Sequence, residues 1–255
     1  MSNRGRDVVE ELLATVDYLR ISVGTADGGR RWLSCNGLIN DPTQLLNIVR
    51  PTAAAWGADD MAAMSLFAQG YVFRVATVAI GSFVLSGDVL SVHPESTAIG
   101  MDQHRLNAVR VDRAELVAAD GDLTVLHRVL IDEHLATFVD AAHRSMPIGE
   151  ALLWGNVGSS CAASFGALVG PLTGQAERIR HLVEDFFATS SRRELARSGH
   201  VVRIGDGLQW AWERNACCLY YQTEISDGAK CADCSLWTPA ERSVRYANAR
   251  RGLTL

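Results

Sequence analysis

The sequence lacks the short motifs that bind nucleotides or assemble common hydrolytic active sites. It has no Walker-type phosphate loop, no G-x-G-x-x-G after a strand pattern, no G-x-S-x-G turn and no H-E-x-x-H zinc motif. Because the dinucleotide fingerprint is missing, a redox activity in this chain would need electrons delivered by another protein.

Lysine is nearly absent, since Lys230 is the only one and arginine supplies the rest of the positive charge. The net charge of −5 over 255 residues argues against a general nucleic-acid binder, which is usually basic. Arginines nevertheless gather near the C-terminus, at Arg242, Arg245, Arg250 and Arg251. They form either an ordinary solvated helix face or a basic face for an anionic ligand or an acidic redox partner.

The sequence also lacks an export signal and an interdomain linker. Its first residues, MSNRGRDVVEELL, turn acidic before any long apolar run. The uncharged apolar part at residues 75–85 is too short to span a bilayer, so we do not expect a membrane-spanning protein. We therefore expect one compact, cytoplasmic body whose thiols stay reduced.

Four of the six cysteines lie within 18 residues, as an adjacent pair, Cys217 and Cys218, and a Cys-x-x-Cys, Cys231 and Cys234. Thiolates select zinc, copper(I) or iron–sulfur clusters, and four of them suit one all-thiolate centre. Adjacent residues of an extended chain point to opposite faces, so the pair reaches one small ion only through a special turn. A larger two-iron cluster tolerates the pair better. The spacing leaves zinc, an iron–sulfur cluster, and disulfides or no centre as open interpretations.

This stretch resembles the C-terminal signature of the FhuF family of ferric-siderophore reductases. The resemblance rests on the cysteine pair followed by Leu219-Tyr220-Tyr221, on Cys231-Ala232-Asp233-Cys234 and on Leu236. It implies that Cys217, Cys218, Cys231 and Cys234 hold a [2Fe-2S] cluster that performs electron transfer. The family pattern most often has ten residues between the pairs, where this chain has twelve. We expect a hairpin-like loop around residues 226–228 to absorb the difference, because loop-closure entropy grows slowly with length.

A second part of the resemblance is the mid-chain sequence Trp154-Gly155-Asn156, and a looser one is Trp56 with the alanine-rich segment after it. The resemblance implies that Trp154 and Asn156 lie beside the cluster loop or the substrate cleft. Arg214 and Asn215 lie just before the cysteine pair, with Ala216 between, and we expect them to donate hydrogen bonds to cluster sulfurs. The candidate substrate-binding residues are Trp154, Asn156, Arg214, Arg242 and Arg245.

The expected fold class is α+β, with a mainly helical body, a small antiparallel sheet and a C-terminal four-cysteine iron–sulfur loop. Residues 1–207 would form the body with the substrate-binding part, and residues 208–255 the [2Fe-2S]-binding region packed on it. Apolar periodicity predicts helices over 7–19, after Asp41-Pro42, within 59–85 as one buried helix or a pair, and over 132–145, 148–169 and 175–189. It predicts strands at 19–23 and 31–35, joined by a turn at 26–29, short strands and turns within 88–126, and a hairpin of 201–204 with 208–212 around a turn at 205–207.

The remaining cysteines and the histidines do not suggest a second metal site. Cys35 is expected as a buried thiol in the strand at 31–35, and Cys161 as a helix-packing residue. The histidines of the central region lack the i, i+4 spacing of a metal-binding pair, which predicts ordinary surface or capping roles. They are His93, His104, His127 and His134.

The leading hypothesis is a ferric-siderophore reductase that converts chelated Fe(III) to Fe(II) with a [2Fe-2S] cluster and releases iron in the cytoplasm. Its partners would be a ferric siderophore and a ferredoxin or other reductase as electron donor. Two alternatives stay open: a zinc-stapled binding module, and an iron–sulfur electron carrier or iron sensor without a siderophore site.

Overall fold

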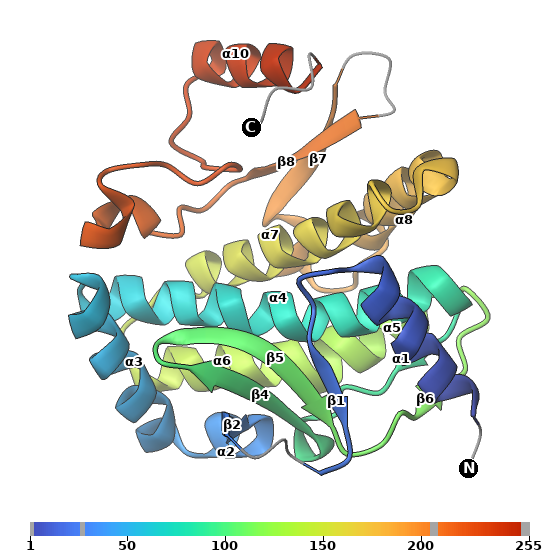
Figure 1. The fold of residues 1–255 in the computed structure, drawn as a ribbon. Coiled ribbons are helices and arrows are strands. Elements are labelled where there is room, and N and C mark those ends of the chain that lie inside the picture. Colours follow the sequence, from blue (N-terminus) through green and yellow to red (C-terminus); the bar gives the residue numbers. More distant parts are fainter. Residues whose placement is uncertain (1–2, 26–28, 205–208, 251–255) are drawn as a thin grey trace.

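The computed structural model describes residues 3–25, 29–204 and 209–250 (Figure 1). Two long apolar helices, α4 (Asp60–Ser86) and α7 (Glu150–Val169), pack along each other through the centre. Helix α4 begins where the Asp59 carboxylate accepts a hydrogen bond from the Ala62 amide, and it ends at Gly87, whose φ is 78°. The segment predicted as one helix or a pair is therefore a single buried helix.

The other helices surround this pair, and the predicted helical segments are confirmed with small shifts at their ends. The Asp41 cap is confirmed too, because its side chain accepts from the Thr43 amide. The other α-helices are α1 (Arg4–Thr15), α2 (Cys35–Asn40), α3 (Pro42–Trp56), α5 (Leu123–Leu126), α6 (Ala136–Ser145), α8 (Ala176–Ala188), α9 (Arg193–Ala196) and α10 (Pro239–Arg250). A π-helix, η2 (His127–Leu135), precedes α6, and short 3₁₀ turns are η1 (Pro94–Ser96), η3 (Thr173–Gln175), η4 (Tyr220–Gln222) and η5 (Glu224–Ser226).

A four-stranded mixed sheet covers one side of the helices, and a two-stranded ribbon adds to it. The sheet has the order β1-β5-β4-β2. Strand β1 runs parallel to β5, whereas β5, β4 and β2 are antiparallel to one another in turn. The bounds are β1 (Ile21–Val23), β2 (Arg31–Ser34), β4 (Thr97–Asp102) and β5 (Arg105–Val111), with the ribbon β3 (Val89–Leu90) and β6 (Leu116–Val117).

Several sequence predictions in this region are wrong in detail. Strands β1 and β2 exist, but they do not pair: β5 and β4 lie between them, because periodicity identifies a strand without naming its partner. The turn predicted at 26–29 falls largely outside the described residues. Cys35 is buried as expected, yet it begins helix α2, since Ser34 caps that helix by accepting from the Gly37 amide. Within 88–126, where short strands and turns were predicted, residues 97–102 form strand β4 but residues 123–126 form helix α5.

Two of the histidines are buried rather than exposed or capping. His93 does cap η1, as predicted. His134 lies in the core, where its Nε2 meets the Tyr71 hydroxyl at 2.6 Å and its Nδ1 the Val92 carbonyl oxygen. His127 is buried as well and its Nε2 contacts the Phe186 carbonyl oxygen. Hydrogen-bond partners for the rings make this burial possible.

Helices α4 and α7 are long and apolar enough to cross a membrane by length and composition, although residues 75–85 alone are too short. In this fold 72% of the apolar window of each helix is buried against other parts of the chain. Core helices of this kind satisfy the same length and composition criteria, so the two helices are weak evidence for a membrane span.

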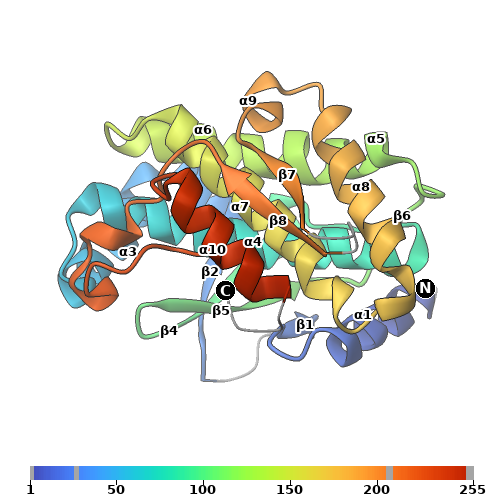
Figure 2. The ribbon, with the colours of Figure 1, turned by 90° about the horizontal axis from the view of Figure 1, so that it is seen from above.

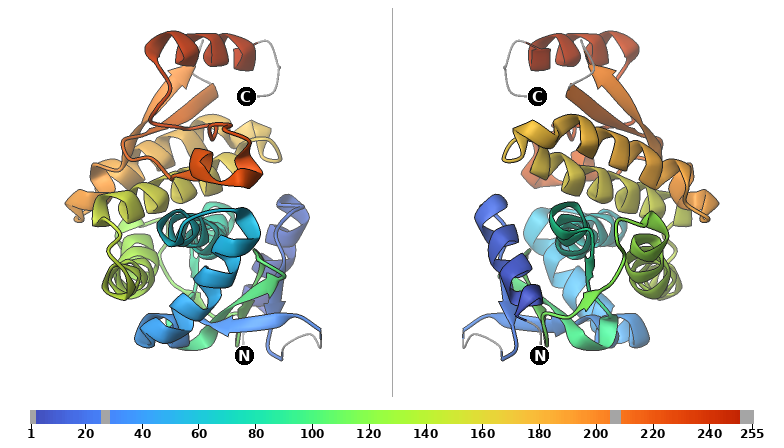
Figure 3. Two further views of the ribbon diagram at one scale, coloured as in Figure 1. Left: turned by 90° about the vertical axis from the view of Figure 1, so that its left-hand side faces the viewer. Right: turned by 90° about the vertical axis from the view of Figure 1, so that its right-hand side faces the viewer.

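The C-terminal segment forms a separate layer on α7. A hairpin of β7 (Gly199–Ile204) and β8 (Gln209–Arg214) is confirmed, with Val201 opposite Trp212, while its turn lies outside the described residues. Figure 1 shows this hairpin and α10 on the side of α7 that faces away from α4 and the four-stranded sheet, and Figure 3 shows the same stacking from both ends. Seen from above, in Figure 2, α10 runs alongside β8. The cysteine loop leaves β8 within this layer.

Candidate metal centre

The four cysteines of the C-terminal loop lie in one neighbourhood and are unevenly buried. Cys218 and Cys234 are 1% and 2% exposed, whereas Cys217 and Cys231 are half-buried. The Cys218 and Cys231 sulfurs are 3.4 Å apart, so the two halves of the motif meet. All six cysteines belong to the described residues, and none forms a disulfide.

The twelve residues between Cys218 and Cys231 fold as successive tight turns rather than as the predicted hairpin-like loop. They contain η4 and η5, and positive φ angles at Leu219, Asp227 and Gly228 reverse the chain. The loop is anchored on the main body, because the Glu224 amide donates to the Gly57 carbonyl oxygen at 3.2 Å. The twelve-residue segment between the thiol pairs therefore contacts the main body at the end of α3.

Backbone amides point at two of the sulfurs. The Leu219 amide donates to Cys217 Sγ and the Leu236 amide to Cys234 Sγ, each at 3.4 Å. Leu219, directly after the cysteine pair, has a left-handed conformation with φ 64° that turns the chain there. Amide hydrogen bonds to sulfur stabilise thiolates and raise the reduction potential of an iron–sulfur centre.

The Cys-x-x-Cys turn is supported from its C-terminal side. Trp237 Nε1 donates to the Cys231 carbonyl oxygen at 2.9 Å, and Arg242 Nε donates to the Trp237 carbonyl oxygen at 3.2 Å. Helix α10 is fixed at its start by a reciprocal cap, in which Thr238 and Glu241 each accept from the other's backbone amide. The turn and the helix therefore form one unit.

The contact between Cys218 and Cys231 shifts the pKa values of the two thiols in opposite directions. The hydrogen bond from the Cys231 thiol lowers the pKa of Cys218 to about 6, against the opposing effect of burial and with the help of the nearby Arg214 charge. The same hydrogen bond, together with burial, raises the pKa of Cys231. Burial raises the pKa of Cys217. Of the two thiols, Cys218 is therefore the more acidic.

The donor set fits a thiolate-bound metal centre in its chemistry. Four cysteines, two of them with amide hydrogen bonds to sulfur, are the ligands that zinc and iron–sulfur clusters use. Within the described part of the chain, however, no group of three or more His, Cys, Asp or Glu side chains is arranged to hold a single metal ion. The thiols are neighbours and do not define a coordination geometry on their own.

A buried polar network connects this loop to both central helices. Asn156 of α7 donates through Nδ2 to the Ser65 carbonyl oxygen at 2.8 Å and to Ser65 Oγ at 2.9 Å. Ser65 Oγ donates in turn to the Cys218 carbonyl oxygen at 2.8 Å. On its other side, the Asn156 Oδ1 accepts from Arg214 Nη2. A second link joins Ser159 of α7 to the Asp233 carboxylate, inside the Cys-x-x-Cys turn.

Two glycines of α7 let the C-terminal layer approach this closely. A Cβ atom at Gly155 would lie 2.8 Å from the Ala216 Cβ, directly before the cysteine pair. A Cβ atom at Gly158 would lie 2.8 Å from the Ser198 Cβ and closer still to its hydroxyl oxygen. Real side chains do not tolerate such distances, so the glycines set the separation of helix and hairpin.

A cavity of about 470 Å³ opens beside the thiols, between α4 and α7. Its wall includes Cys218 and Cys231, and the described residues that complete it are uncharged. They are Leu66, Gln69, Gly70, Phe73, Ser159, Ser160, Ala163 and Tyr220. A ligand in this cavity would contact the two cysteines that lie closest together.

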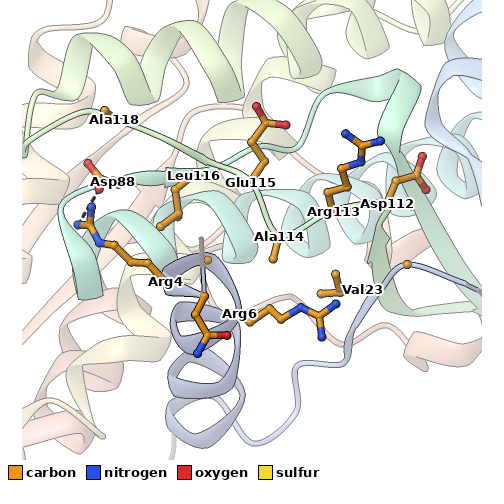
Figure 4. Close-up of a pocket in the computed structure, with 13 residues that line it drawn as sticks. Arg4, Arg6, Val23, Asp88, Asp112, Arg113, Ala114, Glu115, Leu116 and Ala118 are labelled. Carbon is orange, nitrogen blue, oxygen red and sulfur yellow. Dashed lines mark ion pairs between the residues drawn. The ribbon is translucent and has the colours of Figure 1, made fainter. Parts of the chain in front are cut away.

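A second cavity, of about 720 Å³, lies at the start of α1 and next to β6, and no cysteine is among the described residues that line it. Figure 4 shows its charged side chains, which include the ion pair of Arg4 with Asp88 at 2.7 Å and the separate cations Arg6 and Arg113. It has no part in the cysteine site.

Residues 65–198 match the family described as ferric iron reductase FhuF-like transporter, which is more than half of the chain. The chain belongs to the FhuF family. No curated protein matches it. The matched segment begins within α4, contains α7 with the Trp-Gly-Asn sequence, and ends before the four cysteines. FhuF membership supports a function in ferric or siderophore iron reduction in general terms, and it leaves the type of centre open.

The FhuF-like fold brings some of the candidate substrate-binding residues together and keeps others apart. Asn156 and Arg214 meet beside the cysteine pair. Trp154, which is 3% exposed, lies instead beneath Arg192. The Arg192 guanidinium is 5.6 Å from the centroid of the Trp154 ring. Arg242 pairs with Glu213, and Arg245 lies over the Trp237 ring at 4.8 Å. Asn215 turns to the Arg197 carbonyl oxygen rather than to a sulfur.

Sequence reasoning missed Ser65, Ser159 and the α4 side of the cavity. Ser65 lies within an apolar helical pattern, in which a serine is normally interpreted as a small packing residue. Its role depends on a contact with Cys218, 153 positions away in the FhuF-like chain. The one available signal was the Trp-Gly-Asn motif, whose buried asparagine requires polar partners.

Proposed function

We propose that this protein is a one-electron reductase of chelated ferric iron with a [2Fe-2S] cluster on Cys217, Cys218, Cys231 and Cys234. The observation that carries the proposal is the uncharged cavity whose wall contains Cys218 and Cys231. The cluster, when bound, supplies one-electron transfer between a donor protein and the ferric chelate. FhuF-family membership supports the iron chemistry.

The chain's own residues have three tasks in this reaction. The cysteine thiols hold the centre, and the Leu219 and Leu236 amides stabilise their negative charge. The walls of α4 and α7 receive part of the chelate and exclude water from the thiols. The donor, a ferredoxin or another reductase, supplies one electron for each Fe(III). The product Fe(II) is held less tightly by the chelate's hard oxygen ligands, so the iron is released, which we place in the cytoplasm.

The first experiment is spectroscopy on protein purified without oxygen, combined with iron and sulfide analysis. The proposal expects visible absorption, a rhombic EPR signal after one-electron reduction, and oxidation of the reduced protein by a ferric siderophore. A colourless protein with one zinc ion would instead indicate a zinc-stapled binding module. A cluster that ferric siderophores do not oxidise would indicate an electron carrier or iron sensor.

The cavity is tested separately by filling it. Ala163 is exposed and lines the cavity, so Ala163→Trp should slow oxidation by the ferric siderophore without changing the EPR signal. Ala151→Trp is the matched control, because Ala151 is an exposed alanine on the same helix outside the cavity. Equal rates in the two variants would remove the cavity from the proposal.

A further inference from the structure

Arg214 is a buried cation whose guanidinium, among the described residues, donates its hydrogen bond to a neutral group. Its side chain is among the largest fully buried ones, at 1% exposure. Nη2 donates to Asn156 Oδ1, while Nε and Nη1 have no hydrogen-bond partner and no carboxylate forms an ion pair with the guanidinium among the described residues. A guanidinium cannot lose its proton to relieve this cost. Such a group requires negative charge close by.

The cysteines are the metal-ligating groups next to Arg214, and the Asp233 carboxylate lies within their Cys-x-x-Cys turn. Arg214 ends β8 three residues before Cys217, and its partner Asn156 is bonded to Ser65, which donates to the Cys218 carbonyl oxygen. A metal centre with four thiolate ligands concentrates more negative charge there than the Asp233 carboxylate alone. The buried position gives this attraction little screening by water.

The orientation of Arg214 is fixed by the chain rather than by solvent. Asn156 holds Nη2, and Ser65 holds the Asn156 amide, so the guanidinium stays in place whether or not a metal is bound. Alternation along β8 separates it from Glu213, which faces α10 and pairs with Arg242. The cations Lys230, Arg242 and Arg245 of the same layer are more exposed and already engaged, Lys230 with Glu241, Arg242 with Glu213 and Arg245 with the Trp237 ring.

We propose that Arg214, oriented by Asn156 and Ser65, is the fixed counter-charge of the four-cysteine metal centre and raises its reduction potential. This inference rests on the proposed function for the identity of the centre. Reduction adds one negative charge to the centre, and a buried cation stabilises the reduced form more than the oxidised form. Arg214 is thus a positioning residue that acts through the thiolates and need not touch the ferric chelate.

The test compares Arg214→Met, Arg214→Lys and Arg203→Met in potentiometric titrations followed by EPR. Arg203 is the matched control, because it is an exposed arginine on the paired strand β7 with Glu184 as its ion-pair partner. We expect a more negative potential in Arg214→Met, a smaller shift in the same direction in Arg214→Lys, and the wild-type value in Arg203→Met. An unchanged potential in a loaded Arg214 variant overturns the proposal and leaves the reductase function standing.

Melting temperatures of loaded and metal-free protein separate a counter-charge from a purely structural role. A counter-charge predicts that Arg214→Met reduces the stabilisation gained on metal loading, whereas a structural role lowers both melting temperatures equally. If Arg214→Met does not fold, Arg214→Lys supplies both measurements. A wild-type protein that binds zinc and no cluster contradicts the proposed function, yet the loaded-minus-free comparison on the zinc form still decides the role of Arg214.

Discussion

Ser65 Oγ, in the second turn of the central helix α4, donates a 2.8 Å hydrogen bond to the main-chain oxygen of Cys218. The same hydroxyl accepts from Asn156 of α7, so both of its polar positions are used inside the protein. The first half of the cysteine loop is therefore tied to the hydrophobic core and not only to its own layer. Changes in α4 and α7 can reach the cysteine loop through this bond.

Replacing any one of Cys217, Cys218, Cys231 and Cys234 with serine should abolish turnover of ferric siderophore and lower the iron content. A hydroxyl is a poor replacement for a soft thiolate ligand. Cys161→Ala is the control, because Cys161 is a buried packing residue of α7. It should cost about 1 kcal/mol of stability and leave the EPR signal unchanged. Full activity in a Cys217→Ser protein without a cluster would disprove the proposed function.

Gly155→Ala should destabilise the protein by about 1–3 kcal/mol, because the added methyl group would lie 2.8 Å from the Ala216 Cβ. Gly166→Ala on the same helix is the matched control, since its Cβ would lie at an ordinary 3.6 Å from the Trp210 ring. There the better helix propensity of alanine should stabilise by about 0.5–1 kcal/mol. Denaturant unfolding measures both effects, and equal changes at the two sites would contradict the close approach.

Stability should fall as the pH drops below about 6.5, because burial lowers the pKa of His134 to about 4. The unfolded chain binds this proton at the ordinary pKa of 6.5 and the folded chain does not. The stabilising contribution is therefore complete above pH 6.5 and is lost as the pH falls towards 4, by about 3 kcal/mol in total.

Urea unfolding between about pH 7.5 and about pH 5 measures this contribution. His134→Gln should flatten the profile, with a residual slope from His127, whose pKa is also lowered by burial. His181→Gln, at an exposed position, should keep the wild-type slope. An unchanged slope in His134→Gln would show that another group controls the pH dependence.

Glu213→Gln should loosen α10 without unfolding the main body. The Glu213 carboxylate accepts from the Arg242 guanidinium and from the Tyr246 hydroxyl, which are both on α10. Losing this half-buried ion pair should cost about 1–3 kcal/mol locally. Hydrogen exchange of residues 239–250 measures the loss. Glu133→Gln, which removes an exposed ion pair with Arg128, should leave that exchange unchanged.

Local chemistry made much of the fold predictable. Asp41-Pro42 marked the start of α3, and the alternation on each side of the Gly-Asp-Gly turn marked the hairpin. The pairing of β1 with β5 was not predictable, because Ile21 lies opposite Val109, 88 positions later. Such non-local pairing depends on the packing of the whole chain rather than on any short pattern.

The candidate site was likewise predictable from the sequence only in part. The four cysteines were recognisable because they lie in one short segment, and the Trp-Gly-Asn motif drew attention to Asn156, which contacts Arg214. The same motif resemblance suggested Trp154, but on a helix the residue two positions away points to a different face. Thus Asn156 reaches Arg214, while Trp154 lies under Arg192.

Helix α7 contacts both halves of the cysteine motif from positions three residues apart. Asn156 is linked to the Cys217–Cys218 side through Arg214 and Ser65, and Ser159 is linked to Asp233 between Cys231 and Cys234. Because an α-helix rises about 1.5 Å per residue, Asn156 and Ser159 are separated by about 4.5 Å along the axis of α7. Helix α7 thereby fixes the distance between the two thiol pairs. The loop that connects them can change in length without altering that distance.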